Sequence, residues 1–387
     1  MISLQTILLH EYEQLRKVYH LPLRVVRAAE ALMGCRTAAM GGRLEYCPEG
    51  HQERILFNSC QHRFCPRCGY VAAARWLEKM KALLIACPYH HVTFTLPPSL
   101  HALWIYNREA MMDLFFKVVR DTLFTLLADP KYGGLLPGMV CSLHTWGRSI
   151  PLHPHIHCLV TAGGLVCGLM WAHAKKSTLL PYEVVKRFYR GKMIGEIKEA
   201  LKRGQLRLPP GVSRETMEST LNKLSQVKWN VEISEQYAHG NGVIEYLSRY
   251  IRGTPIKNQQ ILSYDSKNVA FQYKDHRDDR EKVMTLPAVE FLRRLLQHVP
   301  PAKKKTVRYF GLYAESNRAL LNKGRAAMGQ EVYEAPEPPT WETLWRGLPE
   351  EKPNLCPICH RPLILGRRIP KRECLHPGVM SPGQEAA

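Results

Sequence analysis

The spacing of apolar positions predicts that the chain begins with helices around a cysteine-rich insert, over residues 1–85. Residues 70–86 carry good helix formers with apolar side chains at helical spacing, and Pro88 follows as a stop signal. The next run, residues 91–96, is β-branched and aromatic and ends at two prolines, which is typical of a strand. Residues 105–128 predict a long amphipathic helix.

The middle of the chain predicts a mixture of strands and helices. Residues 138–146 and 155–161 have the composition of two strands joined by a turn. A helical, basic and weakly apolar stretch, residues 175–228, predicts an insertion that packs on this core and forms no core of its own. The other predicted elements are a short strand at 231–233, a helix at 243–252, a hairpin at 269–273 and 283–286, and a helix at 287–299.

A proline-rich stretch, residues 335–340, divides the end of the chain from the rest, because proline cannot continue a helix or join a central strand. The sequence therefore predicts three units. They cover residues 1–86, residues 87–330 with the helical insertion, and residues 331–387 with the linker and a C-terminal segment.

The charge of the chain indicates its partner. Its 387 residues hold 54 Lys and Arg against 34 Asp and Glu, a net charge of +20, and 45% are hydrophobic, enough for a sizeable core. Such a basic folded chain favours a polyanionic partner, above all nucleic acid. The sequence has no apolar run near the roughly 18 residues that a membrane span requires, and it does not begin with a secretory signal. We therefore expect a cytoplasmic protein without a membrane partner.

Twelve cysteines in a chain expected to be cytoplasmic favour metal binding over disulfides, because thiols stay reduced there. In the first cluster, the C-x2-C pair Cys65 and Cys68 presents two thiolates to one tetrahedral Zn²⁺. We expect Cys47 as a third ligand, and the fourth from Cys60 or His51.

A second cluster lies near the end of the chain. Cys356 and Cys359 form another C-x2-C pair, followed by Cys374 and His376 as a less usual second pair. These four residues predict a second structural Zn²⁺ site. The alternative is a disordered tail with idle thiols.

Histidines alternate over residues 153–157, where the predicted strand at 155–161 begins. His155 and His157 are two apart, so they point to one face and can share a metal ion. If residues 147–151 form the turn, His144 lies opposite His157 and is a possible third ligand. His153 has the same parity but lies near the turn. The alternative is a set of surface histidines without a metal.

Two tyrosines, Tyr246 and Tyr250, are four residues apart and so lie on one face of the predicted helix. A tyrosine hydroxyl, with a pKa of about 10, is a poor nucleophile until a neighbour or a metal assists it. A cation held by histidines would polarise a phosphodiester for attack by each tyrosine in turn. The alternative is that both tyrosines belong to the core beside the apolar stripe of Val243, Leu247 and Ile251.

In this order, the motifs resemble those of the HUH-endonuclease transposases of rolling-circle bacterial insertion sequences, the two-tyrosine group whose founding element is numbered ninety-one. The matches cover most of residues 30–320. They are the first cysteine cluster, residues 91–97, the histidine strand, the tyrosine helix, and residues 290–294 and 308–312.

The resemblance implies an α+β fold with an HUH-type antiparallel central sheet and flanking helices, a helical zinc-binding domain before it and a small zinc-binding segment after it. His155 and His157 would bind catalytic Mg²⁺ or Mn²⁺, and Mn²⁺ suits imidazole ligands better. Tyr246 and Tyr250 would form 5′-phosphotyrosine links with single-stranded DNA at the element's ends and at its target. The family's first zinc pair is commonly C-x2-C, whereas here Gly50 takes the second position.

Basic runs at residues 303–325 and 361–373 are expected to contact the DNA backbone. The leading hypothesis is therefore a bacterial, nucleoid-associated DNA strand transferase. One alternative keeps the chemistry and makes the protein a plasmid or phage rolling-circle replication initiator. Another is a zinc-dependent DNA-binding regulator in which the histidines and tyrosines are structural.

Overall fold

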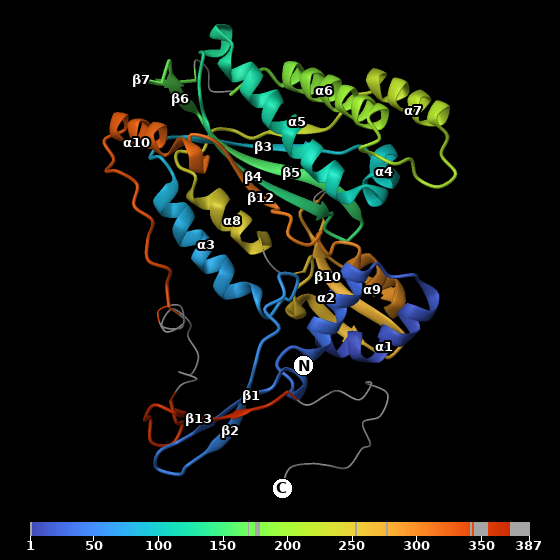
Figure 1. Ribbon diagram of the computed structural model, residues 1–387, viewed down its shortest axis with the longest axis vertical. Helices are drawn as coiled ribbons and strands as arrows, with labels where there is room; N and C mark the ends of the chain where they lie inside the picture. Colours follow the sequence, from blue (N-terminus) through green and yellow to red (C-terminus); the bar gives the residue numbers. More distant parts are fainter. Residues whose placement is uncertain are drawn as a thin grey trace.

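The computed structural model shows a mixed α+β chain with antiparallel sheets (Figure 1). It describes residues 2–371 apart from 169, 175–178, 252–253, 276–277, 341–342 and 344–354. Among these residues, none of the helices is both long and apolar enough to cross a bilayer.

The central sheet has five strands, and every neighbouring pair is antiparallel. In spatial order the strands are β12 (Val307–Gly311), β4 (Gly138–Trp146), β5 (Leu152–Thr161), β3 (Tyr89–Thr95) and β8 (Val231–Ile233). The predicted pair of strands is confirmed as β4 and β5, but β5 begins earlier, at Leu152. The predicted strand at 91–96 is confirmed as β3.

One face of this sheet is covered by four helices, which lie above it in Figure 1: α4 (His101–Tyr106), α5 (Arg108–Ala128), α6 (Tyr182–Lys202) and α7 (Arg214–Gln226). Phe94 and Ile156 of the sheet pack there with Phe115 of α5 and Tyr189 of α6. The predicted helical insertion therefore extends this core, as expected. The predicted helix at 105–128 is divided at Asn107, whose backbone leaves the helical region.

The opposite face is covered by α3 (Gly69–Leu83) and α8 (Asn241–Ile251). Here Val140 of β4 and Leu159 of β5 share a core with Ile244 and Leu247 of α8. Because side chains alternate along a strand, these two sheet residues lie on the face that faces away from α5.

The N-terminal helices belong to a separate hydrophobic cluster. It is formed by α1 (Leu4–Val18), α2 (Leu23–Gly34), α9 (Ala288–Leu296) and a sheet of β9 (Ile261–Tyr264), β10 (Asn268–Lys274) and β11 (Glu281–Pro287). The predicted hairpin and the helix after it are confirmed as β10, β11 and α9. The domain boundaries stay a prediction, although α1 and α2 pack on a segment some 250 residues later in the chain.

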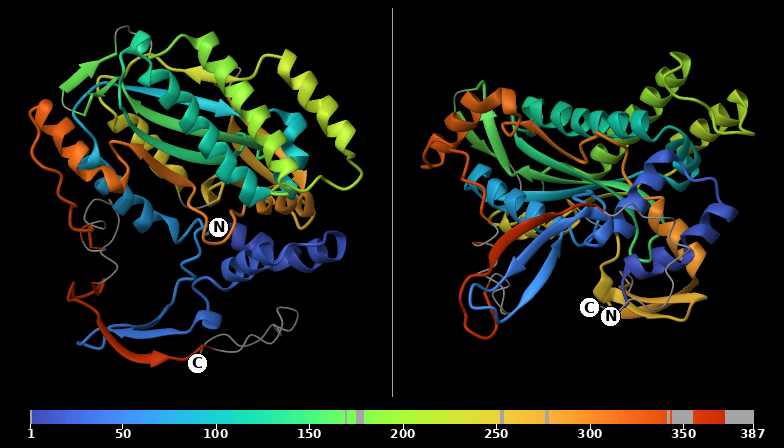
Figure 2. Two further views of the ribbon diagram at one scale, coloured as in Figure 1. Left: turned by 45° about the horizontal axis from the view of Figure 1, so that its top comes forward. Right: turned by 60° about the horizontal axis from the view of Figure 1, so that its bottom comes forward.

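A small sheet at the lower end of the molecule joins the two ends of the chain (Figures 1 and 2). Its strands are β13 (Ile364–Ile369), β1 (Gly42–Tyr46) and β2 (Glu53–Phe57), in that order. The other elements are a ribbon of β6 (Gly163–Val166) and β7 (Met170–His173), packed near α10 (Arg318–Ala327). The sequence interpretation contained none of these five strands.

Gly311 ends β12 at a position that only glycine fits. Its φ is +61°, and a Cβ atom there would lie 1.9 Å from the carbonyl oxygen of Pro137. We expect Gly311→Ala to lower the free energy of unfolding by about 2 kcal/mol or more, through backbone strain and the clash. Gly191→Ala is the control, because its helical site is open and alanine there should add up to about 1 kcal/mol. Urea unfolding measures the stability of both variants. A Gly311→Ala protein with the same unfolding midpoint as the parent would contradict the expectation.

Candidate metal centres and the tyrosine helix

Three histidines of the central sheet form one cluster. His144 on β4 and His155 and His157 on β5 each offer a ring nitrogen, and these atoms lie within 4.8 Å of one another. His144 is directly opposite His155, and Ser142 is opposite His157. The predicted pairing of His144 with His157 was therefore wrong by two residues. A shift of two keeps each side chain on its face, which is why the cluster still forms.

His153, the other possible third ligand, lies outside this group. Its carbonyl oxygen accepts a hydrogen bond from Nδ1 of His155 at 2.7 Å. This bond places the proton of His155 on Nδ1 and leaves Nε2 with the lone pair that a metal needs.

All three clustered rings are held neutral. His144 is 3% exposed and His157 is 7% exposed. Burial, with the neighbouring imidazoles, lowers the pKa of His144 and of His157 well below the ordinary value and that of His155 to about 4. A neutral imidazole is the form that binds a cation, so the set fits a divalent ion. Three nitrogen donors suit Mn²⁺ better than Mg²⁺.

His91 on β3 is a partner of this cluster that the sequence interpretation did not single out as functional. Its Nε2 lies 2.9 Å from Nδ1 of His157, and Thr93 Oγ1 lies 3.2 Å from the same nitrogen. Burial lowers the pKa of His91 to about 4, so this ring is neutral as well. Strand parity could have indicated it, because Thr93 pairs directly with His157 and His91 is two residues away on the same face.

The tyrosine helix is α8, and it covers the face of the sheet that carries the histidines. Val140 shares strand parity with His144, and Leu159 shares it with His157. Both apolar residues pack against α8 through the same core cluster. Tyr246 and Tyr250 lie on this helix, and their side chains fall outside the part of the structure that is described.

The first cysteine cluster is made of Cys35, Cys60, Cys65 and Cys68, with ligand atoms within 4.8 Å of one another. The distance between sulfur atoms is 3.5 Å from Cys35 to Cys68 and 3.7 Å from Cys60 to Cys68. Four thiolates about 2.3 Å from a zinc ion lie roughly 3.8 Å apart, so the group fits tetrahedral Zn²⁺. The side-chain hydrogen bond with Cys60 and backbone N–H groups lower the pKa of Cys65 to about 5, which favours the thiolate.

The predicted grouping of this cluster is corrected at one position. Cys47 does not join Cys65 and Cys68, and Cys35, which was not a predicted ligand, takes its place. Cys35 caps the end of α2 beside this cluster, whereas β1 carries Cys47 away along the small sheet. His51 leaves with the same hairpin, so Cys60 is the fourth member.

A second cluster joins the two ends of the chain: Cys47, His51, Cys356 and Cys359. Cys47 Sγ lies 3.5 Å from Cys359 Sγ and 3.7 Å from Nδ1 of His51. The C-terminal pair was predicted to bind zinc with Cys374 and His376, which lie outside the described residues. In the described part of the chain its neighbours are the hairpin residues, because β13 pairs with β1.

Comparisons with known proteins agree with these features. A family model described as a putative transposase matches residues 138–319, and one described as a transposase zinc-binding domain matches residues 7–96. The putative transposase y4qJ of Sinorhizobium fredii is 34% identical over 345 residues, covering 87% of each chain. The transposase for insertion sequence element IS801 of Pseudomonas savastanoi pv. phaseolicola is 30% identical over 300 residues, covering 75% of this chain and 70% of that protein.

No solved structure matches the chain. The two family models together match most of residues 7–319. The match with each relative covers more than two thirds of that relative's length. The chain therefore belongs to the IS91 family of two-tyrosine transposases with an N-terminal zinc-binding domain.

Proposed function

We propose that this transposase nicks and joins single-stranded DNA through 5′-phosphotyrosine intermediates, with Tyr246 and Tyr250 as nucleophiles. The observation that carries the proposal is the packing of α8, the tyrosine helix, on the sheet face that bears the histidine cluster. A five-stranded antiparallel sheet with two histidines on a central strand is also what the resemblance to HUH endonucleases implies. Family membership favours transposition over replication initiation.

His144, His155 and His157 would hold the catalytic cation. When bound, the ion supplies a Lewis acid that polarises the phosphodiester. The hydroxyl oxygen of a tyrosine attacks phosphorus, a tyrosine–phosphate bond forms, and the bond to the 3′-oxygen breaks. The tyrosine loses its proton and the leaving 3′-oxygen gains one, so the cut strand ends in a free hydroxyl. In the joining step, a 3′-hydroxyl attacks the phosphotyrosine, which is the reverse of the cut. A second tyrosine would allow this exchange to take place with another strand.

The zinc-binding clusters of the chain would be structural. We assign one Zn²⁺ to Cys35, Cys60, Cys65 and Cys68, and a second to Cys47, His51, Cys356 and Cys359. Neither group leaves an open position for substrate, since each supplies four protein ligands.

Part of the basic run at 303–325 is used within the fold. Lys304 and Arg308 both pair with Asp113, and Arg325 donates to the carbonyl oxygens of Ala82 and Leu84. The expected DNA contacts in this run are therefore fewer than its charge suggests.

The small sheet offers a clearer basic surface. Arg43 and Arg368 are exposed and directly opposite each other on neighbouring strands, so they lie on one face. We include this face among the contacts to the DNA backbone.

The function is tested by incubating the protein with a single-stranded oligonucleotide from an element end and Mn²⁺ or Mg²⁺. The expected product is a covalent protein–DNA adduct that survives denaturation, disappears on protease treatment and does not form when the cation is chelated. Tight DNA binding without an adduct under any of these conditions would favour the regulator and contradict the proposal.

His91 should act as a positioning residue for His157. We expect His91→Phe to lower the affinity for Mn²⁺ by roughly 10- to 100-fold, as is typical when a hydrogen-bonded partner of a metal-binding histidine is lost. His91→Gln, which keeps a hydrogen-bonding group, should recover part of it. The measurement is adduct yield against Mn²⁺ concentration, with the exposed His173→Gln as control. A lower yield at every Mn²⁺ concentration, with an unchanged midpoint, would contradict the positioning role.

A further inference from the structure

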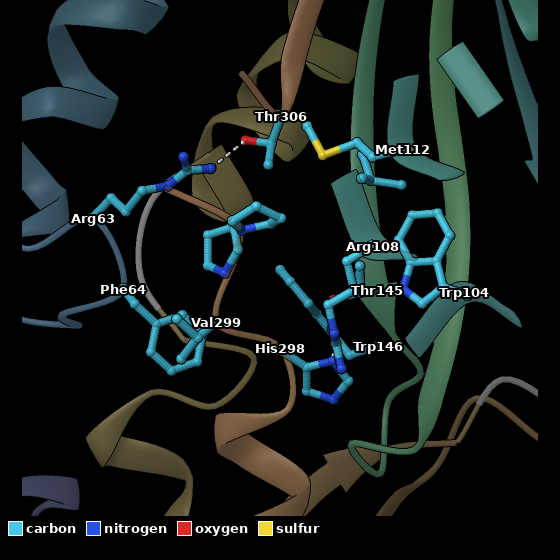
Figure 3. Close-up of a pocket in the computed structure, with 13 residues that line it drawn as sticks. Arg63, Phe64, Trp104, Arg108, Met112, Thr145, Trp146, His298, Val299 and Thr306 are labelled. Carbon is cyan, nitrogen blue, oxygen red and sulfur yellow. Dashed lines mark hydrogen bonds between the residues drawn. The ribbon is translucent and has the colours of Figure 1, made fainter. Parts of the chain in front are cut away.

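A pocket lies next to the histidine cluster, at the end of β4. Its cavity volume is about 40 Å³, and it opens to solvent. Figure 3 shows its walls, which come from the start of α5, the end of β4, the segment after α9 and the loop before α3. Its lining includes Arg63 and Arg108, and no carboxylate.

Arg108 brings a positive charge into this pocket without a compensating anion. One of its terminal nitrogens donates to the carbonyl oxygen of Gln297 at 2.7 Å, and its Nε is buried without a hydrogen-bond partner. Burial and the nearby charge of Arg24 lower the pKa of Arg108 to about 10. Among the described residues no carboxylate pairs with Arg108, since Glu109 acts on Arg24 instead. A partly buried cation with an enclosed Nε loses part of its hydration, and an anion in the pocket would offset that cost.

Trp104 adds a second unsatisfied donor to the same pocket. Its side chain is only 2% exposed, and its Nε1 is buried without a hydrogen-bond partner. Figure 3 shows the indole nitrogen on the side of the ring that faces Arg108 and Thr145. A buried indole N–H normally finds an acceptor. Two donors that lack acceptors, in one pocket, call for a ligand rich in oxygen acceptors and negative charge.

The pocket shares a wall with the histidine cluster. The ring of Trp146 lines the pocket and stacks on His144, with 5.3 Å between ring centroids. The same ring lies 5.9 Å from the ring of His298, which also lines the pocket. Leu143 of the pocket points to the sheet face that α5 covers, whereas His144 points to the opposite face, so the pocket and the cluster meet only at the end of β4, around Trp146. A DNA strand whose phosphate is at the histidines would reach the pocket with a neighbouring phosphate by passing around this end of the strand.

Arg63 is already held in place at the rim. Its terminal nitrogens donate to the carbonyl oxygen of Lys304 at 2.7 Å and to Thr306 Oγ1 at 3.3 Å. Because Arg63 comes from the zinc-binding part of the chain, the pocket links that part to the catalytic sheet.

We propose that Arg108 and Trp104, with Arg63 at the rim, bind a phosphodiester of the DNA strand next to the one that is cut. The proposal rests on the proposed function for the position of the cut. It assigns the pocket to substrate positioning, so that a nucleotide beside the cleavage site is fixed before a tyrosine attacks.

The test measures binding of a single-stranded oligonucleotide from an element end to the full-length Tyr246→Phe/Tyr250→Phe protein, in which no cleavage competes. Each phosphate near the cut is replaced in turn by an uncharged methylphosphonate. Arg108→Met is compared with the exposed Arg214→Gln as the matched control. Thermal unfolding of every variant is recorded without DNA.

We expect one methylphosphonate position to weaken binding about tenfold, the usual order for losing a charged hydrogen bond, and Arg108→Met to weaken binding of the unmodified strand equally. The two changes together should cost no more than either alone. Arg214→Gln should keep the full response to methylphosphonate. Arg108→Met should unfold at the same temperature as the parent or higher, because it removes a partly buried charge that no carboxylate compensates.

Three results would overturn the proposal. The first is equal DNA affinity of Arg108→Met and the parent. The second is the same methylphosphonate profile in both, which would show that Arg108 contacts no phosphate. The third is stabilisation by millimolar inorganic phosphate that depends on Arg108, with DNA affinity unchanged, which would assign the pocket to a free anion. Because binding is measured without cleavage, a failure of adduct formation in the wild type tests the proposed function separately.

Discussion

The Tyr246→Phe/Tyr250→Phe protein is expected to form no covalent adduct with single-stranded DNA, with the yield falling by at least about 10³-fold. Phenylalanine keeps the ring and removes only the hydroxyl oxygen that would attack phosphorus. The fold and the binding of DNA should therefore be retained. Adduct formation is followed on a denaturing gel with a DNA strand labelled at its 3′ end. The label is placed there because the fragment that stays bound to the tyrosine, through its 5′-phosphate, is the one that carries the 3′ end.

The two single variants separate the roles of the tyrosines. Each should still form an adduct with one strand, because one nucleophile remains, but neither should complete a cut, a second cut and a joining reaction. Tyr182→Phe on α6 is the matched control, since this tyrosine is exposed and lies on a helix of the other sheet face. An adduct that persists in the double variant at wild-type yield would identify a different nucleophile.

The histidine cluster shows what strand patterns predict well. Alternation requires only that a segment is extended, so it correctly placed His155 and His157 on one face. The pairing of His144 depended on where β5 begins and on an irregularity between His144 and Trp146, which no local pattern indicates. The predicted register was wrong by an even number of residues. Because side chains alternate with a period of two, the same side chains still lie on the shared face.

The cysteine clusters show what spacing cannot predict. A C-x2-C pair defines half of a zinc site, and the fold selects the other half. Cys356 and Cys359 find Cys47 because β13 returns to pair with β1, more than 300 residues earlier in the chain. No local pattern in residues 1–85, which were interpreted as helices around a cysteine-rich insert, predicts this pairing of strands. Cys35 was missed because it lies at the end of a helix, far from the other three in sequence.

The pocket beside Arg108 could not be predicted from the sequence, for a similar reason. Residues 105–128 have the periodicity of one helix, which would present Arg108 as an ordinary surface cation. In the structure Asn107 breaks the helix and bonds with the backbone of Arg207, which lies between α6 and α7 of the insertion. Arg108 is then covered by elements from both ends of the chain, with Arg24 of α2 near it. Burial of a charge by distant segments has no local signature.

The two zinc clusters should respond very differently to loss of a ligand. Cys65 is 2% exposed and belongs to the hydrophobic cluster of α1, α2 and α9. We expect Cys65→Ser to release one zinc ion and to unfold this module, because structural zinc commonly contributes on the order of 10 kcal/mol to the fold that it closes. The measurements are zinc content by mass spectrometry and thermal unfolding. A folded Cys65→Ser protein that keeps all its zinc would contradict the assignment.

Cys356→Ser should also release one zinc ion, but the main unfolding transition should hardly move, because this cluster belongs to none of the hydrophobic cores of the described chain. Its loss should instead free β13 from β1, which limited proteolysis would detect as early cleavage after residue 340. Cys167→Ser, an exposed cysteine outside both clusters, is the control and should keep all the zinc.

Two further variants decide which residues complete the C-terminal cluster. If the ends of the chain share one zinc ion, Cys47→Ser must lose it and Cys374→Ser must keep it. The opposite result would restore the grouping expected from sequence, in which Cys374 and His376 complete a separate C-terminal site. A shared ion would also make the zinc-binding module dependent on the C-terminus, because truncation before Cys356 would remove two of the four ligands and leave only Cys47 and His51, between β1 and β2.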